Sequence, residues 1–570
     1  MSTRVRALHP QDKVEDYLAR GWFSGETVDG VFAARVADNP DRLALVDPAN
    51  KAALVGAAPR RLTWADLDSE SDALAAQFLR HGLTRGDILA VQMPNSVEMV
   101  TVFLAAWKVG IVVTPLAVQY REHELGIVGR QAEPTAYLTS GRVGEHDLLT
   151  PALTVCRELA SVRTVLRYLP PDVSAEPVEG VSTLVAGPAS ATDRSELAAY
   201  RDQRGPLDPN DAMTICWTSG TEAEPKGVPR THLEWLAAAW AGVDAPGIVA
   251  DDVILNPFPM INMAAFVGLL LPWLRTGCVL VQHHPFDLPT FLGQIASERV
   301  TYTVAPPALL MMLLHNESLL ASCDLSSVTR LGSGSAPLQP SMVAGWQEKH
   351  GIGVINFFGS NEGIALLSSP ADFPDPVERA QFFPNYACPG YQWASRISTW
   401  VQVRLVDPIT EEVITEPGVP GELRIGGPTV FPGYVRPDLH PMPFDGDGFL
   451  KSGDLFEIAG AQGQFLRFVD RARDLIIRGG VNISPAEVEG LIAAHPSVAE
   501  VAVVGDPDEV FGERVAAFVA VKPGTSLTLA DLADFLQGRH VAPYKIPERL
   551  EVVDALPRNP VGKVLKRALR

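Results

Sequence analysis

Strand and helix patterns alternate in the early part of the chain, and this alternation restricts the fold class more than any other sequence feature. Asp87 to Met93 has the apolar run of a buried strand, and Pro94-Asn95 then opens a helix that Gly110 ends. A second apolar run, Ile111 to Leu116, follows at once. A strand–helix–strand unit of this kind is typical of an α/β sheet with parallel strands. We therefore expect an α/β protein.

The 570 residues are too many for one hydrophobic core, so we expect several folding units. The pattern changes near residue 470, where a charged run precedes a short apolar strand, a helix that starts at Ser484 and two alternating stretches up to Val521. The final segment is long enough for a small α+β domain. We predict a large N-terminal lobe of layered α/β sheets over residues 1–469 and a small C-terminal domain over residues 470–570.

The charge is acidic and uneven along the chain. Residues 1–469 carry 34 basic and 53 acidic side chains, whereas residues 470–570 carry 13 and 14. The net charge of −20 disfavours a protein that binds nucleic acid through a basic face. The last thirteen residues hold five positive charges and no acid, and a functional tail of this composition would meet an anionic group.

The five cysteines are scattered, and none of them forms a C-x-x-C pair. This spacing argues against a disulfide framework and against a cysteine zinc site. The N-terminal residues have no apolar core of a signal peptide. The longest apolar stretch, Ile261 to Leu274, contains Asn262 and Pro272 and is too short to span a bilayer. We expect a cytoplasmic protein without a membrane span.

One loop has the composition of a phosphate-binding segment. Trp217 to Gly227 follows an apolar run and combines glycine, serine and threonine with Lys226. Backbone N–H groups and hydroxyls at the end of a strand can approach phosphate oxygens, and a lysine adds a point charge. It is not a Walker A loop, because Lys226 precedes its glycine. Taken alone, the segment is equally compatible with a solvated turn.

Three further segments could serve the same site. Phe357 to Gly363 offers an aromatic ring for a base and a carboxylate, Glu362, for Mg²⁺. Lys451 to Asp454 places an aspartate after a turn, where it could bind ribose hydroxyls or its own backbone. Pro557 to Lys563 could deliver a lysine to a site formed elsewhere, or could be a frayed basic terminus.

Together these segments resemble the adenylate-forming superfamily of acyl-CoA synthetases, adenylation domains and luciferases. The resemblance runs from about residue 25 to the end, and it is nearest to acyl-CoA ligases for cyclohexanecarboxylate, aryl or medium-chain acids. It also covers Gly332-Ser-Gly-Ser-Ala-Pro337, Gly421-Glu-Leu-Arg424, Asp470-Arg-Ala-Arg-Asp474 and Ile476 to Glu489. It implies an AMP-forming acid–thiol ligase that uses ATP, Mg²⁺ and coenzyme A, with a mobile C-terminal domain.

The resemblance also implies a role for each motif residue. The β- and γ-phosphates of ATP would be bound by Thr218, Ser219, Gly220, Thr221 and Lys226, and the α-phosphate by Asn361. The wall around adenine would be formed by Gly334, Ser335, Asn356 and Phe358, and the ribose would be bound by Asp454 and Arg471. Lys563 would stabilise the charge of the α-phosphate and the attacking carboxylate, and Glu362 would hold the metal. The C-terminal domain would swing about Arg473. That movement would withdraw Lys563 and present Arg478, Gly479 and Gly480 to CoA.

The sequence departs from the family pattern at three places. Glu222 and Ala223 stand where the phosphate loop usually has Thr-Gly, and Glu224 follows. Carboxylates repel a triphosphate, so we expect these two acids to point to water. Asn361 replaces the usual threonine, and we expect its amide to donate to the α-phosphate. Asn262 stands where a histidine or an aromatic residue is common.

The acid itself is weakly encoded. The resemblance places the walls of the acyl pocket at His232, Trp235, Asn262, Phe266, Gly334 and Ile364. We see no cation placed to pair with a second carboxylate, and small residues leave volume for a ring, so we predict an alicyclic, aromatic or medium-chain monocarboxylic acid. A stand-alone adenylating enzyme that loads a carrier protein, and a non-catalytic acyl or nucleotide binder, remain alternatives. Whether the protein is a monomer or a homodimer is left open.

Overall fold

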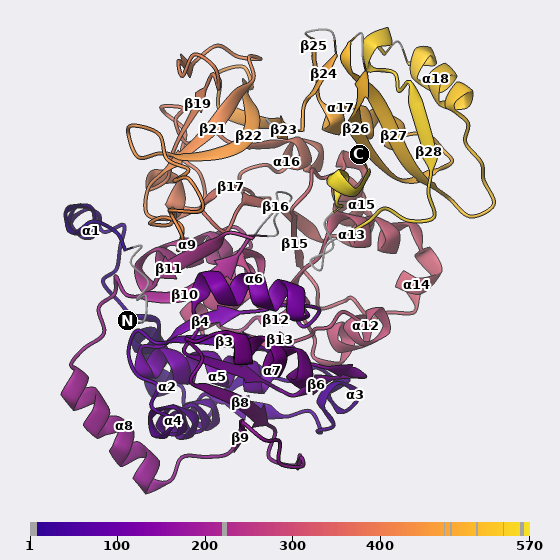
Figure 1. The fold of residues 1–570 in the computed structure, drawn as a ribbon. Helices are drawn as coiled ribbons and strands as arrows, with labels where there is room; N and C mark the ends of the chain where they lie inside the picture. Colours follow the sequence, from indigo (N-terminus) through magenta and orange to yellow (C-terminus); the bar gives the residue numbers. More distant parts are fainter. Residues whose placement is uncertain are drawn as a thin grey trace.

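The structure is a computed structural model that describes residues 8–218, 225–471, 474–478, 481–508, 511–539, 541–558 and 564–569. A large lobe of layered sheets and helices occupies most of the chain, and a smaller C-terminal unit with its own sheet lies at one end of it (Figure 1). The expected α/β class with layered sheets is confirmed.

The first sheet contains the strand–helix–strand unit expected around residues 87–116. The capping box of Thr63 and Asp66 starts helix α4, and α5 ends at Gly110, whose φ of 90° suits glycine. The strands run parallel except for the antiparallel edge pair β10–β11. In spatial order they are β11 (Gly227–Thr231), β10 (Ala212–Trp217), β4 (Val112–Pro115), β3 (Ile88–Gln92), β5 (Ala136–Thr139), β8 (Thr164–Leu169) and β9 (Val181–Val185).

The second sheet is parallel through its centre and antiparallel at both edges. Its middle strands read as near-continuous apolar runs because helices cover both faces of such a sheet. In spatial order its strands are β17 (Ile364–Ser368), β16 (Gly353–Gly359), β15 (Arg330–Gly334), β14 (Tyr302–Val304), β12 (Val253–Asn256), β13 (Val279–Gln282), β1 (Leu43–Val46) and β2 (Arg61–Thr63).

Helices cover these sheets, and a short hairpin of β6 (Arg142–Val143) and β7 (His146–Asp147) lies outside them. Several of the helices begin at side-chain caps, which satisfy free N–H groups of the first turn. The helices of the large lobe are α1 (Gln11–Ala19), α2 (Val28–Asp38), α3 (Lys51–Val55), α4 (Trp64–Arg80), α5 (Val97–Val109), α6 (Glu122–Ala132), α7 (Leu149–Glu158), α8 (Ala191–Arg204), α9 (His232–Asp244), α10 (Met263–Ala265), the π-helix η1 (Phe266–Leu270), α11 (Leu271–Thr276), α12 (Leu288–Ser297), α13 (Pro307–His315), α14 (Glu317–Ala321), α15 (Pro340–His350), α16 (Pro376–Gln381) and the 3₁₀-helix η2 (Arg396–Thr399).

A third, antiparallel sheet completes the large lobe. Its β23 ends at Arg471, and the next strand of the chain, β24, begins at Ile476 in a different sheet. The predicted boundary at residue 470 falls beside this change of sheet. In spatial order the strands are β18 (Phe382–Pro384), β23 (Phe465–Arg471), β22 (Leu450–Ala459), β21 (Gly421–Gly426), β19 (Gln402–Val406) and β20 (Val413–Ile414).

The C-terminal unit packs two helices on one small sheet. Ser484 caps α17 through a hydrogen bond from the Glu487 N–H, as the sequence pattern suggests. Buried valine, isoleucine and leucine side chains from the sheet and both helices form its own core. Its elements are β25 (Val481–Ile483), β24 (Ile476–Arg478), β27 (Gly512–Val521), β26 (Val498–Asp508), β28 (Arg549–Val552), α17 (Pro485–Ala493), α18 (Leu529–Gly538), and the 3₁₀-helices η3 (Pro543–Lys545) and η4 (Lys566–Leu569).

Aromatic side chains fill the core between the first two sheets. Trp64 stacks on Trp273 with ring centroids 4.6 Å apart. Phe266 lies between Phe103 and Trp235, with centroid distances of 5.8 and 5.1 Å. Stacked aromatic pairs contribute beyond their buried area. All five side chains belong to the main hydrophobic core of the large lobe.

Candidate active site

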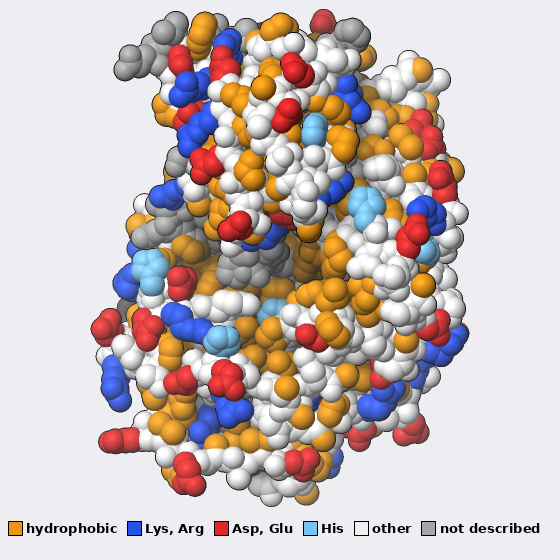
Figure 2. All heavy atoms as spheres, turned by 90° about the vertical axis from the view of Figure 1, so that its right-hand side faces the viewer, with side chains coloured by type: hydrophobic (Ala, Val, Ile, Leu, Met, Phe, Trp, Pro, Cys, Tyr) orange, Lys and Arg blue, Asp and Glu red, His pale blue; other side chains and the backbone are white. Residues whose placement is uncertain are grey.

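A large cleft of about 2620 Å³ brings together most of the described residues predicted to bind ATP. It is lined by the ends of β10, β15 and β16, by α10 and α13, by β22 and β23, and by α17 and β26 of the C-terminal unit. Figure 2 shows the hollow between the C-terminal unit and the large lobe, with hydrophobic side chains on its walls and charges of both signs at its rim. Four sheets, three of the large lobe and that of the C-terminal unit, thus contribute side chains to one space.

The base of the predicted phosphate loop is closed by two hydrogen bonds. The Thr218 N–H donates to the Lys226 carbonyl at 3.1 Å, and the Lys226 N–H donates to Thr218 Oγ1 at 3.0 Å. The Lys226 ammonium lies 5.4 Å from the centre of the Tyr434 ring, which is a cation–π distance. Both loop-end residues line the cleft and so present a cation and a hydroxyl to it.

Glu362 lies in the turn between β16 and β17 and faces the same cleft. Its Oε1 accepts a hydrogen bond of 3.1 Å from the buried Tyr434 hydroxyl. Its carbonyl accepts from the Phe431 N–H at 2.8 Å, which fixes the turn against the loop after β21. Tyr434 therefore contacts both Glu362 and Lys226, and sequence reasoning missed it. The only signal available was one tyrosine in the loop Phe431-Pro-Gly-Tyr434.

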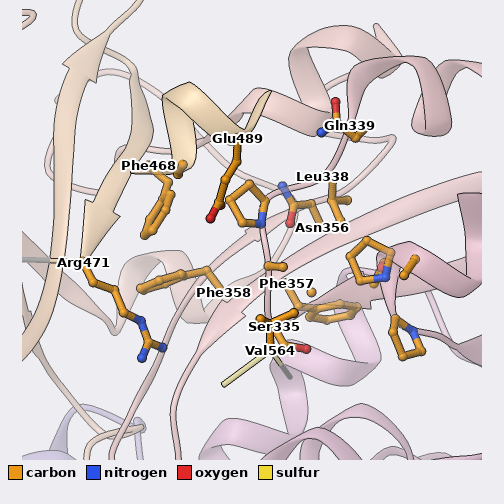
Figure 3. A pocket seen from close by; sticks show the side chains of 18 of the residues that line it. Ser335, Leu338, Gln339, Asn356, Phe357, Phe358, Phe468, Arg471, Glu489 and Val564 are labelled. Carbon is orange, nitrogen blue, oxygen red and sulfur yellow. The ribbon is translucent and has the colours of Figure 1, made fainter. Parts of the chain in front are cut away.

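The predicted adenine wall is assembled from the adjacent strands β15 and β16. A Cβ on Gly334 would lie 2.5 Å from the Phe357 carbonyl, so only glycine fits there. Ser335 has a φ of 67°, an uncommon conformation for a serine and one that recurs at functional sites. Asn356 donates from Nδ2 to the Ala380 carbonyl at 3.2 Å. Figure 3 shows Ser335, Asn356 and Phe358 around the same opening.

The predicted ribose residues are paired across two strands. Asp454 on β22 and Arg471 on β23 are register partners, and Arg471 Nε lies 3.4 Å from Asp454 Oδ1. Both side chains are half-buried and line the cleft. Phe468 approaches the same opening beside Phe358 (Figure 3), and the two rings are 6.4 Å apart. The residues predicted to bind adenine and those predicted to bind ribose thus lie side by side in the cleft.

Only some of the residues predicted to form the acyl pocket line the cleft. Asn262 and Gly334 line the cleft. His232, Trp235 and Phe266 are instead no more than 2% exposed and do not line it. His232 Nδ1 accepts from the Val28 N–H at 3.1 Å, and Trp235 Nε1 donates to Thr214 Oγ1 at 2.8 Å. Their polar atoms are used inside the core, so we correct their expected position from the pocket wall to the layer behind it.

The residues that do form this part of the wall come from a short helical segment. Ile261, Met263, Ala264, Val267 and Gly268 line the cleft around Asn262. The segment contains the π-helix η1, a rare element that is often found near functional sites. Asn262 caps α10 by accepting from the Ala264 N–H at 3.1 Å. The neighbours of Asn262 in this wall are uncharged, which gives the acid side an apolar surface.

Several predicted residues lie outside the part of the chain that the structure describes. They are Ser219, Gly220, Thr221, Glu222, Ala223 and Glu224 of the loop, the hinge Arg473, Gly479, Gly480 and Lys563, and the side chain of Ile364. The predictions made for them stay predictions.

Arg478 is described, but it does not line the cleft. Its guanidinium bonds Glu548 Oε1 at 2.7 Å and lies 4.2 Å from the centre of the Phe511 ring. The neighbouring carboxylate raises the pKa of Arg478 through this hydrogen bond. The side chain that the family resemblance assigns to CoA is therefore held by partners within the C-terminal unit.

The Asn361 amide makes two hydrogen bonds within the protein. Its Nδ2 donates to the Trp217 carbonyl at 3.0 Å, and its Oδ1 accepts from the Met263 N–H at 3.0 Å. Only one N–H of the amide is left for the predicted bond to the α-phosphate. Arg230 of β11 donates to the Asn361 carbonyl from Nε and Nη2, at 2.9 and 2.7 Å. Sequence reasoning missed Arg230, although an arginine in the apolar strand Gly227-Val-Pro-Arg-Thr231 was a visible signal.

The described residues contain neither a membrane-spanning helix nor a cluster of metal ligands. No helix in that part of the chain is both long and apolar enough to cross a membrane. No three histidine, cysteine, aspartate or glutamate side chains gather there into a metal cluster. A divalent cation with a single carboxylate ligand and substrate phosphates would not need such a cluster.

Comparison with known proteins follows the same division of the chain. A family model described as AMP-binding enzyme matches residues 32–435, and one described as AMP-binding enzyme C-terminal domain matches residues 487–563. The ATP-bound structure of MatB from Rhodopseudomonas palustris aligns with a TM-score of 0.74 and 26% identity, over 96% of this chain and 98% of that one.

Three curated relatives match over most of their length. A 2-hydroxy-7-methoxy-5-methyl-1-naphthoate–CoA ligase of Streptomyces carzinostaticus is 30% identical, over 98% of this chain and 96% of the relative. A medium-chain fatty-acid–CoA ligase of Escherichia coli strain K12 is 30% identical, over 93% and 88%. A salicyl-AMP ligase/salicyl-S-ArCP synthetase of Mycobacterium tuberculosis is 29% identical, over 98% and 93%.

Proposed function

We propose, on the premise that this chain belongs to the AMP-binding enzyme family and is an AMP-forming ligase, that it joins a monocarboxylic acid to coenzyme A through an acyl-adenylate. One observation carries the proposal. The phosphate-loop base, Glu362, the adenine wall and the Asp454–Arg471 pair, which are far apart in sequence, line one cleft whose acid side is apolar. Each of these groups suits one part of ATP or of an acid.

In the first half-reaction, an oxygen of the carboxylate attacks the α-phosphorus of ATP, and the bond to the bridging oxygen of pyrophosphate breaks. Both reactants are anions, so the reaction needs positive charge more than it needs a base. Lys226 lies at the loop base, and we assign Lys563 to the α-phosphate and the incoming carboxylate. The hydroxyl of Thr218 and the backbone of its loop would orient the phosphates.

A Mg²⁺ ion fits the residues that are present. The Glu362 carboxylate faces the cleft, and the Tyr434 hydroxyl holds one of its oxygens at 3.1 Å. One fixed carboxylate together with phosphate oxygens and water is a common ligand set for Mg²⁺. When bound there, the ion would neutralise phosphate charge. Tyr434 would orient Glu362 for this task.

In the second half-reaction, a thiol sulfur attacks the acyl carbon, the acyl–oxygen bond to AMP breaks, and the thiol proton is lost to solvent. We propose that the C-terminal unit turns about Arg473 between the two steps. The Arg478–Glu548 pair would then travel with that unit as a rigid part of it. The glycines at 479 and 480 would leave room for the arm that carries the thiol.

For the acid, we propose an alicyclic, aromatic or medium-chain monocarboxylate. Ile261, Met263, Ala264 and Val267 present apolar surface to the cleft, and Asn262 supplies a polar group beside them. A second carboxylate or an ammonium group in the acid would be buried there without an opposite charge, which is costly. The 30% identical relatives named for a naphthoate and for medium-chain fatty acids support this class.

The test is a panel of acids assayed for AMP release with ATP, Mg²⁺ and CoA. Benzoate, salicylate, cyclohexanecarboxylate and octanoate represent the proposed class, and palmitate, malonate and phenylalanine are the contrasts. We expect turnover with at least one acid of the first group. The Glu362→Gln variant is the control for background hydrolysis. A preference for palmitate, the diacid or the amino acid would reject the proposed substrate class.

A second candidate is an adenylating enzyme that loads a carrier protein. The relative named salicyl-AMP ligase/salicyl-S-ArCP synthetase favours this candidate, because the match with this chain covers 93% of that relative. The same panel can be run with a phosphopantetheinylated carrier protein in place of CoA. Transfer to the carrier without transfer to CoA would support this candidate over the first. Absence of acid-dependent pyrophosphate–ATP exchange across the whole panel would favour a non-catalytic binder, an alternative motivated by Glu222, Ala223 and Asn361.

A further inference from the structure

Arg230 is a buried cation behind the candidate site. It is 0% exposed, and its three nitrogens donate only to backbone carbonyls: Nε and Nη2 to Asn361, and Nη1 to Thr429 at 2.7 Å. The Trp235 ring lies 5.0 Å from the guanidinium carbon. Two donors of the rigid guanidinium fork therefore converge on one peptide group, the one that joins Asn361 to Glu362.

The charge of Arg230 has no carboxylate within salt-bridge distance among the described residues. The nearby acid Glu234 is engaged elsewhere, with the Thr231 N–H at 2.7 Å and with His9 Nε2 at 3.2 Å. Burial lowers the pKa of Arg230, and the charges of Glu234 and Glu362 oppose that effect. A buried cation bonded only to neutral groups is unusual, and here it holds the peptide group next to Glu362, a residue that does line the cleft.

The Asn361 side chain extends the contact in two further directions. Nδ2 bonds the Trp217 carbonyl, which ends the strand before the phosphate loop. Oδ1 bonds the Met263 N–H, which begins the apolar wall on the acid side. Residue 361 therefore connects three segments: the phosphate-loop strand, the acid wall and, through its own peptide group, Glu362.

We propose that Arg230 and Asn361 act together as positioning residues that couple the nucleotide side of the cleft to the acid side. This inference rests on the proposed function. Arg230 holds the peptide that orients Glu362, and the Asn361 amide ties the end of β10 to the start of α10. Neither residue needs to touch a reacting atom. Loss of the hydrogen bonds of either residue would let the loop base, the Glu362 carboxylate and the acid wall move relative to one another.

The first experiment uses Asn361→Ala, because Asn361 is half-buried and its removal leaves the backbone contacts in place. Asn385→Ala is the matched control. Asn385 also donates once, to the Gly463 carbonyl at 2.8 Å, and accepts once, from the Ala387 N–H at 3.1 Å, but it does not line the cleft. Affinity for the Mg²⁺ complex of α,β-methylene ATP is measured by titration calorimetry, and KM for ATP and for an acid from the panel by pyrophosphate exchange.

We expect Asn361→Ala to weaken analogue binding and to raise KM for both ATP and the acid, each by about 5- to 30-fold, as one or two lost hydrogen bonds would. Asn385→Ala should lower the melting temperature about as much as Asn361→Ala does, but it should leave the analogue affinity and both KM values unchanged. A merely structural role would lower the melting temperature without moving the two KM values together. Unchanged affinities in Asn361→Ala, with an active parent enzyme, would overturn the inference.

The second experiment separates charge from orientation. Arg230→Lys keeps the cation but removes the two-pronged bond to the Asn361 carbonyl, so we expect at least a tenfold loss of kcat/KM and a higher Mg²⁺ requirement. Arg330→Lys is the control, since Arg330 also donates to two carbonyls, those of Pro246 and Gly247, away from the cleft. Full activity of Arg230→Lys would reject the orienting role.

The outcomes separate the two proposals. If the unsubstituted protein binds no nucleotide analogue and exchanges no pyrophosphate with any acid, the proposed function fails. If the unsubstituted protein does both and the Asn361→Ala and Arg230→Lys variants match it, only the positioning inference fails.

Discussion

Tyr434 illustrates how one residue can connect two motifs. Its hydroxyl holds a Glu362 oxygen, while its ring lies beneath the Lys226 ammonium. One side chain thus contacts both the carboxylate and the ammonium of the candidate site. The position of Glu362 in the cleft thus depends on a residue 72 positions away in sequence.

Tyr434→Phe removes this hydroxyl and keeps the ring. We expect about a 3- to 10-fold fall in the rate of adenylation, because one hydrogen bond to a charged carboxylate is lost. Pyrophosphate exchange measures the effect. Tyr391→Phe is the matched control, since the Tyr391 hydroxyl also donates to a side-chain oxygen, that of Gln462, but outside the cleft. Equal rates in the two variants would contradict the role of Tyr434.

At the scale of elements, helices α3 and α5 are joined by a buried charge cluster. Lys51 Nζ lies 2.5 Å from Asp47 Oδ2 and 2.7 Å from Glu98 Oε1, and all three side chains are at most 2% exposed. Arg60 adds a bond to Glu98 at 2.8 Å. A buried network of this kind stabilises one arrangement of the helices only while every charge keeps its partner.

Lys51→Met breaks the network at its centre. It leaves Asp47 and Glu98 buried close together with like charges, and we expect a loss of about 3–5 kcal/mol in the free energy of unfolding. Urea denaturation followed by tryptophan fluorescence measures it. Arg61→Met, which removes a partly exposed bond to Glu298, should cost less than about 1 kcal/mol. A similar loss of unfolding free energy in both variants would show that the buried cluster contributes no more to stability than an exposed ion pair.

The same cluster makes stability depend on pH. Burial, and then the charge of Glu98, raise the pKa of Asp47 to about 6 from 3.8. Folding therefore takes up a proton between these values, so the contribution of Asp47 to stability falls as pH rises through this window. Asp47→Asn removes that slope. The free energy of unfolding of Asp47→Asn, relative to that of the parent, should rise by about 2–2.5 kcal/mol between pH 4 and pH 7. A difference that is constant with pH would contradict this assignment.

At the scale of the whole molecule, the cleft lies where the C-terminal unit meets the large lobe. Asp470 stands at this junction, where its carboxylate accepts from the Ser484 hydroxyl at 2.7 Å and from the Ala486 N–H at 2.9 Å. A residue of β23, the last strand of the third sheet, thus accepts hydrogen bonds at the start of the first helix of the C-terminal unit. Lys566 near the chain end bonds Glu489 on that helix at 2.7 Å.

The two half-reactions should separate in the Lys563→Ala variant. We expect adenylation to slow by at least about 100-fold, because a charge that stabilises the transition state is lost. Thioester formation from supplied acyl-adenylate should be nearly unchanged, since Lys563 would be withdrawn in that step. Pyrophosphate exchange measures the first step, and single-turnover transfer to CoA measures the second. An equal loss in both would argue against a domain that alternates between the steps.

The sequence by itself determined the local elements and the kinds of residue at the site. Caps, glycines and apolar runs act within a few residues, so α5, β3, β4 and the start of α17 could be predicted, with ends within about three residues. The motif loops could be predicted for the same reason. Their order along the chain also indicated the family before any contact between them was known.

Only the tertiary structure decided which side chains share the cleft. His232, Trp235 and Phe266 are buried behind its wall because core partners take their polar atoms and ring faces, and periodicity alone does not distinguish a wall from a core. Arg230, Tyr434 and the internal use of the Asn361 amide depend on contacts between distant segments. Such contacts arise only when strands from different sheets end side by side, and no local pattern in the sequence records them.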